Sequence, residues 1–233
     1  MKLLADFNEA SKRVLVYSSA NDAANSPLIY LHIYDDDVAT PLNALSQLNL
    51  PPFSLAIISG LSWDDDMSPW GAKAIYKGDS DFGGRADLYL KLLLENIAPK
   101  VEQSLNENAI KVSNKYIAGY SLAGLFALYA LYKCEYFSGA ASVSGSLWYE
   151  NFLDFAITKQ MPKKPKMIYL SLGDKEAKTK NALVAKVEQN TKELATHYEN
   201  CGIKTIFELN DGGHFKDISP RTARAIKALL DNL

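Results

Sequence analysis

Short apolar runs alternate with amphipathic or helix-like segments along most of the chain. The apolar runs are rich in β-branched residues, which is typical of strands buried in a sheet. They cover residues 13–18, 28–33, 55–59, 116–118, 139–144, 166–172 and 203–209, and the helical patterns cover residues 40–50, 85–105, 125–132, 147–157, 181–201 and 221–233. Because each parallel connection needs a crossover helix, this alternation predicts a mostly parallel sheet with helices on both faces.

No repeat, low-complexity tract or domain boundary interrupts this pattern in the 233 residues, a length sufficient for one α/β domain with a real core. We therefore predict a single α/β domain over residues 1–233, built as a three-layer sandwich. Residues 60–84 read as a long irregular loop, and loops of this length are usually functional. Pro99 predicts a kink or break in the helix over residues 85–105.

Composition and charge exclude several classes of partner. With 22% charged residues and a formal charge of −2, the chain offers no electrostatic case for nucleic acid or an anionic membrane. No apolar run approaches the roughly 20 residues of a membrane helix, and residues 1–13 lack a signal-peptide pattern. We therefore expect a cytoplasmic protein. Cys134 and Cys201 fall outside any zinc-ligand spacing and read as buried or incidental thiols, so we expect neither a metal nor a cofactor.

The segment KYIAGYSLAGLFALYALY, residues 115–132, predicts a strand, a tight turn and a helix in direct succession. This is the context in which a G-x-S-x-G motif marks a nucleophilic serine. A serine at such a turn has a strained backbone and needs very small neighbours, here Gly119 and Ala123, with Gly124 giving further room. The pattern thus indicates Ser121 as a nucleophile at the start of a helix, where the positive end of the helix dipole favours an oxyanion.

Three reactive residue types follow three of the predicted strands. Ser121 ends one strand, Asp174 and Glu176 follow the next but one, and His214 lies in a glycine turn after the last. Side chains at the carboxyl ends of parallel strands meet at one edge of the sheet, and the order serine, acid, histidine is that of α/β-hydrolases. A histidine that takes the serine proton and a carboxylate that orients the histidine would activate the hydroxyl.

The acid is the open choice of this trio. Asp174 and Glu176 both fit the spacing, and Glu176 is favoured because its longer arm reaches the histidine more easily. For the oxyanion we expect two backbone donors, the amides of Leu122 and Tyr34. The remaining histidines read as structural, His32 as a hydrogen-bonded core residue and His197 as a solvated one.

Several motifs beyond the turn resemble the "putative esterase" family of α/β-hydrolases, which includes esterase D, feruloyl esterases and siderophore esterases. They are IAGYSLAGLFAL at 117–128, MSPW at 67–70, FGG at 82–84 with AD at 86–87, VSGSLW at 143–148, LGDKE at 172–176 and GGHF at 212–215. The resemblance spans most of the chain from residue 28 onward, and it is closest to uncharacterised bacterial members. It implies the α/β-hydrolase fold, with Ser121 as nucleophile, His214 as base and Glu176 as acid; the short chain leaves little room for a lid domain.

The resemblance also implies that the loop carrying Trp63 and Trp70 borders the substrate site. Trp148 and Tyr120 complete the aromatic candidates for substrate binding. Where siderophore esterases carry an arginine before the Ser-Pro-Trp segment, this chain has three aspartates at 64–66, which predicts against an anionic catecholate ester. The same three aspartates otherwise read as a solvated loop face.

We conclude from the sequence that the chain is a serine hydrolase that cleaves a small-molecule carboxylic ester through an acyl-enzyme. An acyltransferase or a thioesterase would use the same residues and stays an alternative. The rival from another class is a non-catalytic binding protein on the same fold. The sequence gives neither the acyl and alcohol groups nor the oligomeric state.

Overall fold

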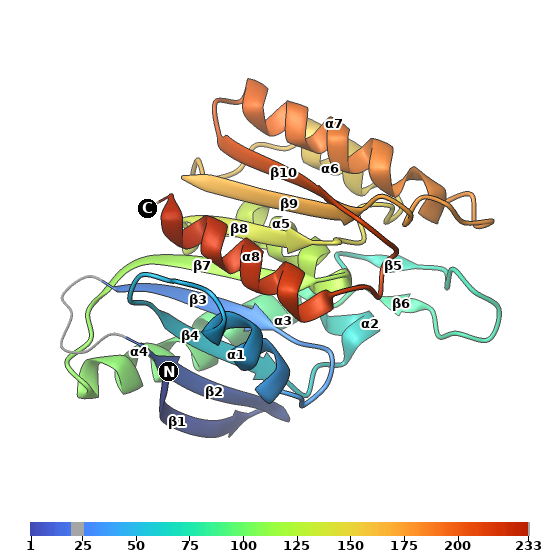
Figure 1. Ribbon diagram of the computed structural model, residues 1–233. Coiled ribbons are helices and arrows are strands. Elements are labelled where there is room, and N and C mark those ends of the chain that lie inside the picture. Colours follow the sequence, from blue (N-terminus) through green and yellow to red (C-terminus); the bar gives the residue numbers. More distant parts are fainter. Residues whose placement is uncertain (20–25, 233) are drawn as a thin grey trace.

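One twisted sheet of eight strands runs through the computed structural model, which describes residues 1–19 and 26–232 (Figure 1). The strand order is β1-β2-β4-β3-β7-β8-β9-β10. The bounds are β1 Lys2–Glu9, β2 Lys12–Ser18, β3 Ser26–His32, β4 Ser54–Ser59, β7 Val112–Tyr120, β8 Gly139–Val143, β9 Met167–Gly173 and β10 Lys204–Asn210. Only β1 and β2 run antiparallel to their neighbours, and the pairs from β4 to β10 are parallel. The predicted mostly parallel sheet is confirmed.

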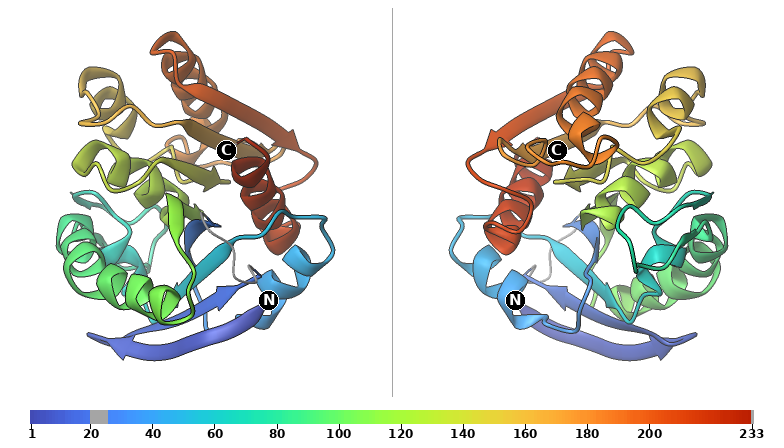
Figure 2. Two further views of the ribbon diagram at one scale, coloured as in Figure 1. Left: turned by 90° about the vertical axis from the view of Figure 1, so that its left-hand side faces the viewer. Right: turned by 90° about the vertical axis from the view of Figure 1, so that its right-hand side faces the viewer.

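Helices cover both faces of this sheet (Figure 2). The first core packs on α3 (Ala86–Leu92), α4 (Ala98–Glu107), α5 (Leu122–Lys133), α6 (Phe152–Thr158) and α7 (Val187–Asn200). The second core lies on the opposite face, under α1 (Ala39–Ser46) and α8 (Ile218–Asp231). Strands β3, β4, β8 and β9 are buried along their whole length, and β7 is buried over residues 116–119, as expected for strands covered on both sides.

The register of the parallel strands brings distant segments to one edge. His32 of β3 pairs with Gly119 of β7, so the segments after these two strands leave the sheet side by side. Gly173 of β9 pairs with Asn210 of β10, which places the acid-bearing turn beside the turn that carries His214. Residues far apart in sequence therefore meet above the carboxyl ends of the strands.

Several elements differ from the predictions. Strand β1 was not predicted, because its residues at the edge of the sheet are only partly buried and give a weak alternation. The segment 60–84 is not wholly irregular, since it contains a helical turn α2 (Trp63–Asp66) and a small hairpin of β5 (Gly71–Ala72) and β6 (Phe82–Gly83).

The helix interrupted by Pro99 does not end there. It passes through a π-helical segment, η1 (Leu93–Ile97), and continues as α4, with Pro99 as its second residue. Because proline lacks an N–H, Pro99 removes one helical hydrogen bond, and the π-helical segment directly before α4 is the irregularity found at that point. The helix expected over 181–201 begins as a short 3₁₀ turn, η2 (Val184–Lys186), before α7. The helix expected over 221–233 is α8, which ends at Asp231. Leu233, the last residue of that prediction, lies outside the described residues. Within the described part of the chain, no helix combines the length and apolarity needed to cross a membrane.

Candidate active site

Ser121 occupies the strained turn that the sequence predicts between a strand and a helix. Its backbone has φ of 60° and ψ of −123°, between the end of β7 and the start of α5. A Cβ at Gly119 would lie 2.4 Å from the Cβ of Ala123, and one at Gly124 would lie 3.0 Å from the Gly119 carbonyl oxygen. The turn therefore closes only with very small residues at these positions, as the steric argument required.

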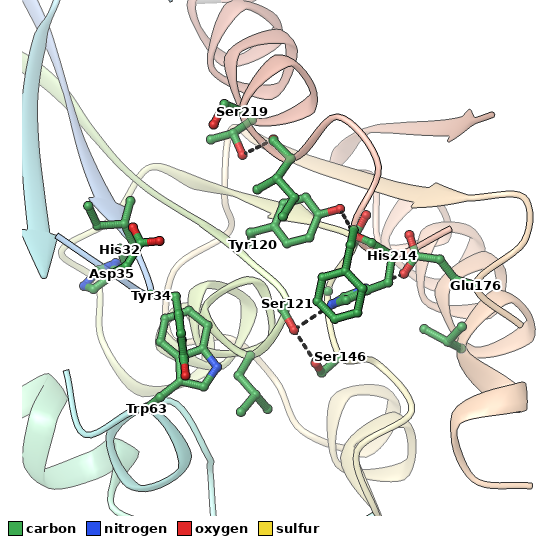
Figure 3. Close-up of a pocket in the computed structure, with 18 of the residues that line it drawn as sticks. His32, Tyr34, Asp35, Trp63, Tyr120, Ser121, Ser146, Glu176, His214 and Ser219 are labelled. Atoms are coloured by element: carbon green, nitrogen blue, oxygen red, sulfur yellow. Dashed lines mark hydrogen bonds and ion pairs between the residues drawn. The ribbon is translucent and has the colours of Figure 1, made fainter. Parts of the chain in front are cut away.

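The imidazole of His214 lies within hydrogen-bonding distance of both expected partners (Figure 3). Its Nε2 is 3.0 Å from the Ser121 Oγ, and its Nδ1 is 2.7 Å from Glu176 Oε2. The serine hydroxyl, the ring and the carboxylate thus form an unbroken chain of hydrogen bonds. The structure brings together Ser121, His214 and Glu176, which the sequence placed at three different strand ends.

Asp174, the second candidate acid, points elsewhere. Its Oδ1 accepts a hydrogen bond of 2.7 Å from the Gly212 amide, and its own amide donates to the Asn210 carbonyl. Gly212 has φ of +106°, a conformation that favours glycine, and it precedes His214 by two residues. The carboxylate of Asp174 therefore braces the turn that carries the histidine and does not contact the ring.

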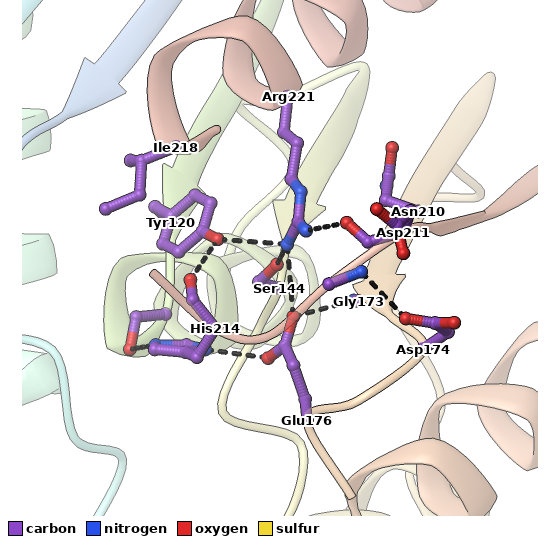
Figure 4. A network of polar contacts seen from close by, with 12 residues as sticks. Tyr120, Ser144, Gly173, Asp174, Glu176, Asn210, Asp211, His214, Ile218 and Arg221 are labelled. Carbon is purple, nitrogen blue, oxygen red and sulfur yellow. Dashed lines mark hydrogen bonds and ion pairs between the residues drawn. The ribbon is translucent and has the colours of Figure 1, made fainter. Parts of the chain in front are cut away.

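Glu176 is held from several sides (Figure 4). Its Oε1 accepts from the Gly173 amide at 2.7 Å and lies 3.4 Å from the Arg221 guanidinium. Burial alone would raise the pKa of Glu176, but the hydrogen bond and charge of His214, with donors from Gly173 and Ser144, bring it below the ordinary value. The carboxylate is therefore ionised at neutral pH, as a partner for an imidazolium must be.

A cavity of about 920 Å³ opens in front of Ser121, His214 and Glu176. Aromatic side chains supply much of its wall. Trp63 and Tyr34 meet edge to face, with ring centroids 5.1 Å apart, and the largely buried Trp148 packs on Phe82. The cavity has the size and apolar lining of a small-molecule site.

Of the other aromatic residues predicted to bind substrate, Trp70 lies outside the cavity and Tyr120 lines it. Trp70 does not line the cavity: its indole N–H donates to the Glu150 carbonyl at 3.0 Å, among the rings of Tyr129, Tyr149, Phe152 and Phe155. The structure thus gives Trp70 a packing position, because its loop turns inward onto α6. The Tyr120 ring lines the cavity, and its hydroxyl donates to the His214 carbonyl at 2.5 Å.

A model of the esterase family described as "Putative esterase" matches residues 53–217. The chain belongs to this esterase family. Membership makes the chain a carboxylic ester hydrolase. This confirms the prediction made from the sequence and the resemblance of its motifs to this family.

A relative and two solved structures are similar to this chain in sequence or in fold. "Uncharacterized protein YbbA" of Bacillus subtilis (strain 168) is 25% identical over 199 residues, which are 82% of this chain and 79% of that protein. Siderophore hydrolase EstB of Aspergillus nidulans is similar with a TM-score of 0.77 and 19% identity, over 98% of this chain and 94% of that one. EstA of the same organism gives 0.74 and 20%, over 94% and 90%. The esterase therefore has the α/β-hydrolase fold, and no large lid is evident.

The two residues whose backbone amides are expected to bind an oxyanion follow neighbouring strands, Tyr34 after β3 and Leu122 after β7. Leu122 is the first residue of α5, where an amide has no acceptor inside its own helix. Tyr34 lies two residues beyond His32, and Ser121 lies two residues beyond its pairing partner Gly119. Leu122 and Tyr34 both line the cavity, and their amides stay the predicted donors.

His32 departs from the expectation of a hydrogen-bonded core residue. It is 1% exposed, and neither ring nitrogen makes a hydrogen bond of ordinary geometry within the described residues, although the Ala118 backbone lies near enough to oppose part of the effect of burial. Burial lowers the pKa of His32 to about 3, so the ring is neutral. It packs edge-on against Tyr89 and Phe126, which makes it an apolar part of the core.

The three aspartates of α2 do not form one acidic face. Asp65 pairs with Arg85, and Asp66 pairs with Lys12 at 2.5 Å. Asp64 instead lines the cavity, and among the described residues its carboxylate has neither an ion pair nor a hydrogen bond. Burial, Asp79 and Asp65 raise its pKa, in that order. The acidic character predicted for this loop therefore reaches the cavity through Asp64.

Sequence reasoning missed three polar residues around the triad. Ser146 Oγ lies 3.3 Å from Ser121 Oγ, and its amide donates to the Ser121 carbonyl. Ser144 and Arg221 lie behind Glu176 and contact each other at 3.2 Å. The two serines stand in the VSGSLW motif, which carried the family resemblance but no role, and an arginine near a helix start reads as a surface residue.

Proposed function

We propose that this esterase cleaves its ester through a Ser121–His214–Glu176 triad and a covalent acyl-enzyme. The supporting observation is the continuous pair of hydrogen bonds, 3.0 Å from the Ser121 Oγ to the ring and 2.7 Å from the ring to Glu176. Such a chain lets the ring accept the serine proton while the carboxylate stabilises the resulting imidazolium. A strained serine at a helix start adds exposure of the hydroxyl and a favourable field for negative charge.

In the first half-reaction, the Ser121 oxygen attacks the ester carbonyl while its proton passes to His214 Nε2. The amides of Leu122 and Tyr34 bind the oxyanion, and the imidazolium then gives its proton to the leaving alcohol. In the second half-reaction, His214 takes a proton from water, which attacks the acyl-enzyme. Collapse of that intermediate releases the acid and returns the proton to Ser121.

The charge of the cavity indicates an uncharged or cationic ester. Asp35, Asp37, Asp64 and Asp79 line it; among the described residues Lys175 is the one lysine that does so, and it pairs with Asp211. A siderophore ester is the second candidate, favoured by the likeness to EstA and EstB. The aspartates would repel an anionic catecholate, so an uncharged siderophore ester is the form that fits this cavity.

The decisive experiment uses p-nitrophenyl acetate and two serines that lie 3.3 Å apart. We expect Ser121→Ala to lose at least about 1000-fold in kcat, because the nucleophile is gone. Ser146→Ala, its neighbour and control, should keep most of the activity. Retention of wild-type activity by Ser121→Ala would overturn the proposal. Product analysis with a competing alcohol distinguishes hydrolysis from acyl transfer, and a matched thioester measures thioesterase activity.

A further inference from the structure

An arginine is completely buried behind the proposed triad. Arg221, in the first turn of α8, is 1% exposed. Its guanidinium contacts Glu176 Oε1 at 3.4 Å, Ser144 Oγ at 3.2 Å and the Asp211 carbonyl at 2.9 Å. Burying a charged group costs free energy unless it is paired and hydrogen-bonded, and Glu176 is the carboxylate that pairs with this one.

The two carboxylate oxygens of Glu176 face different groups (Figure 4). Oε2 accepts from His214, whereas Oε1 accepts from the Gly173 amide and faces Arg221. This division leaves the carboxylate little freedom to rotate. It also leaves Glu176 between two groups that favour its ionised form, one on each oxygen.

The same guanidinium connects all three segments that carry the triad. It contacts Glu176 directly, and it contacts the Asp211 carbonyl in the turn that leads to His214. It also donates to the Tyr120 hydroxyl at 3.4 Å, next to Ser121 in sequence, and that hydroxyl in turn donates to the His214 carbonyl. One side chain from α8 thus contacts each of the three segments that carry the triad.

We propose that Arg221 is a positioning residue that keeps the Glu176 carboxylate ionised and directed at His214. The inference rests on the proposed function, because a positioned acid matters only if the triad acts. The groups facing Glu176 are His214, Arg221, the Tyr120 phenol, the Ser144 hydroxyl and the Gly173 amide. Burial raises the pKa of Glu176, and the positive charge of Arg221 opposes that rise. Without the arginine, Glu176 is protonated more easily.

A matched control lies on the same helix. Arg224, three residues later, pairs with Glu208 at 3.1 Å and also binds Asn210. Its side chain is 41% exposed and it contacts none of the triad residues. An effect caused merely by removing an arginine from α8 would therefore appear in both Arg221→Gln and Arg224→Gln. An effect on the protonation of Glu176 should appear only in Arg221→Gln.

The experiment follows the protonation of Glu176 directly, by ¹³C NMR of protein labelled at the glutamate carboxyl carbon. The Glu176 signal is assigned by its loss in Glu176→Gln. In the wild type and Arg224→Gln, we expect the carboxyl to stay ionised to below the ordinary pKa of a glutamate. In Arg221→Gln, we expect its titration to move upward by about one pH unit or more. In Arg221→Lys, which keeps the charge, the shift should be largely reversed.

The kinetic readout is the pH profile of kcat/KM for p-nitrophenyl acetate. Circular dichroism at each pH checks that the variants are folded. Arg221→Gln should move the acid limb of the profile to higher pH, and Arg221→Lys should move it less. An unshifted Glu176 titration in folded Arg221→Gln would overturn the inference, as would an equal shift in Arg221→Lys. If the titration shifts but the wild type cleaves no ester, the proposed function fails while the effect of Arg221 on Glu176 stands.

Discussion

In the part of the chain that the structure describes, polar groups are paired on one side of the cavity and unpaired on the other. We call the side with Ser121, His214 and Glu176 the triad wall, and the side with Asp64 and Asp79 the facing wall. On the triad wall, Glu176 is bonded to His214, and Asp174 and Arg221, which lie behind the lining, are each bonded to other parts of the protein. On the facing wall, Asp64 and Asp79 have neither hydrogen-bonded nor ion-paired side chains within the described residues. Tyr76 on that side is 54% exposed, and Tyr34 is 71% exposed.

This difference indicates a division of labour. Groups that are fixed before substrate arrives cost no reorganisation during the reaction, which is what the proposed triad needs. Groups without internal partners are free to pair with a ligand, so the facing wall is where substrate charge and shape would be recognised. Changes on the triad wall should therefore act on catalysis with every substrate, and changes on the facing wall should act on preference among substrates.

The largest expected effect separates the two acids of the triad wall. Glu176→Gln should lower kcat by about 1000-fold or more with any ester, because the ring loses its carboxylate partner. Asp174→Asn makes the same chemical change two residues away and keeps a carbonyl oxygen for the Gly212 amide. It should cost about threefold or less, since one neutral hydrogen bond replaces a charge-assisted one. Equal losses in kcat for the two variants would contradict the assignment of the acid.

Gly119→Ala tests how tightly the triad wall is packed. The added methyl would lie 2.4 Å from the Ala123 Cβ, so we expect a loss of about 1–3 kcal/mol in the free energy of unfolding, measured with urea. Gly213→Ala is the control, because a Cβ there meets no atom within 4 Å. If both variants are as stable as the wild type, the turn around Ser121 is looser than described.

Asp64→Asn tests the facing wall. We expect kcat/KM for a choline ester to fall about threefold to fivefold, as for a partly exposed ion pair, while that of the neutral 3,3-dimethylbutyl isostere stays the same. Asp81→Asn is the control from the same loop, because Asp81 already pairs with Lys73 at 2.7 Å. A parallel fall for both esters would show that Asp64 supports the fold of the loop and does not read charge.

Tyr120→Phe should have the smallest effect. It removes the hydrogen bond from the ring hydroxyl to the His214 carbonyl but keeps the ring against the cavity. We expect a decrease of about twofold to fivefold in kcat, with KM unchanged, because a neutral hydrogen bond to the His214 carbonyl is lost together with the longer contact of 3.4 Å from Arg221. A large rise in KM would instead make Tyr120 a substrate-binding residue, as its sequence position suggested.

Much of this triad wall could be predicted from the sequence, because local patterns carry it. The apolar runs that become β7, β9 and β10 locate Ser121, Glu176 and His214 at the ends of strands, although only β9 is buried along its whole length and β10 is mostly half-buried. Small residues around Ser121 signal the turn by a steric need that acts within five positions. The choice between Asp174 and Glu176 was harder, since it depends on which carboxylate the turn points toward the ring.

The remaining features depend on long-range packing. Arg221 is buried because α8 lies against β8 and β9, and nothing in its local sequence distinguishes it from the half-exposed Arg224. Trp70 turns inward because α6 offers it aromatic neighbours, although its loop is exposed in parts. Asp65 and Asp66 find cations from distant segments, so a run of three acids leaves only Asp64 toward the cavity.

The central claim is that Ser121 carries the acyl group between the two half-reactions. Its most direct test is mass spectrometry of the protein quenched during turnover of a slowly hydrolysed p-nitrophenyl ester, followed by peptide mapping. The account predicts one added acyl group, located on Ser121, and none in Ser121→Ala. An acyl group found on another residue, or sustained turnover by Ser121→Ala, would contradict it.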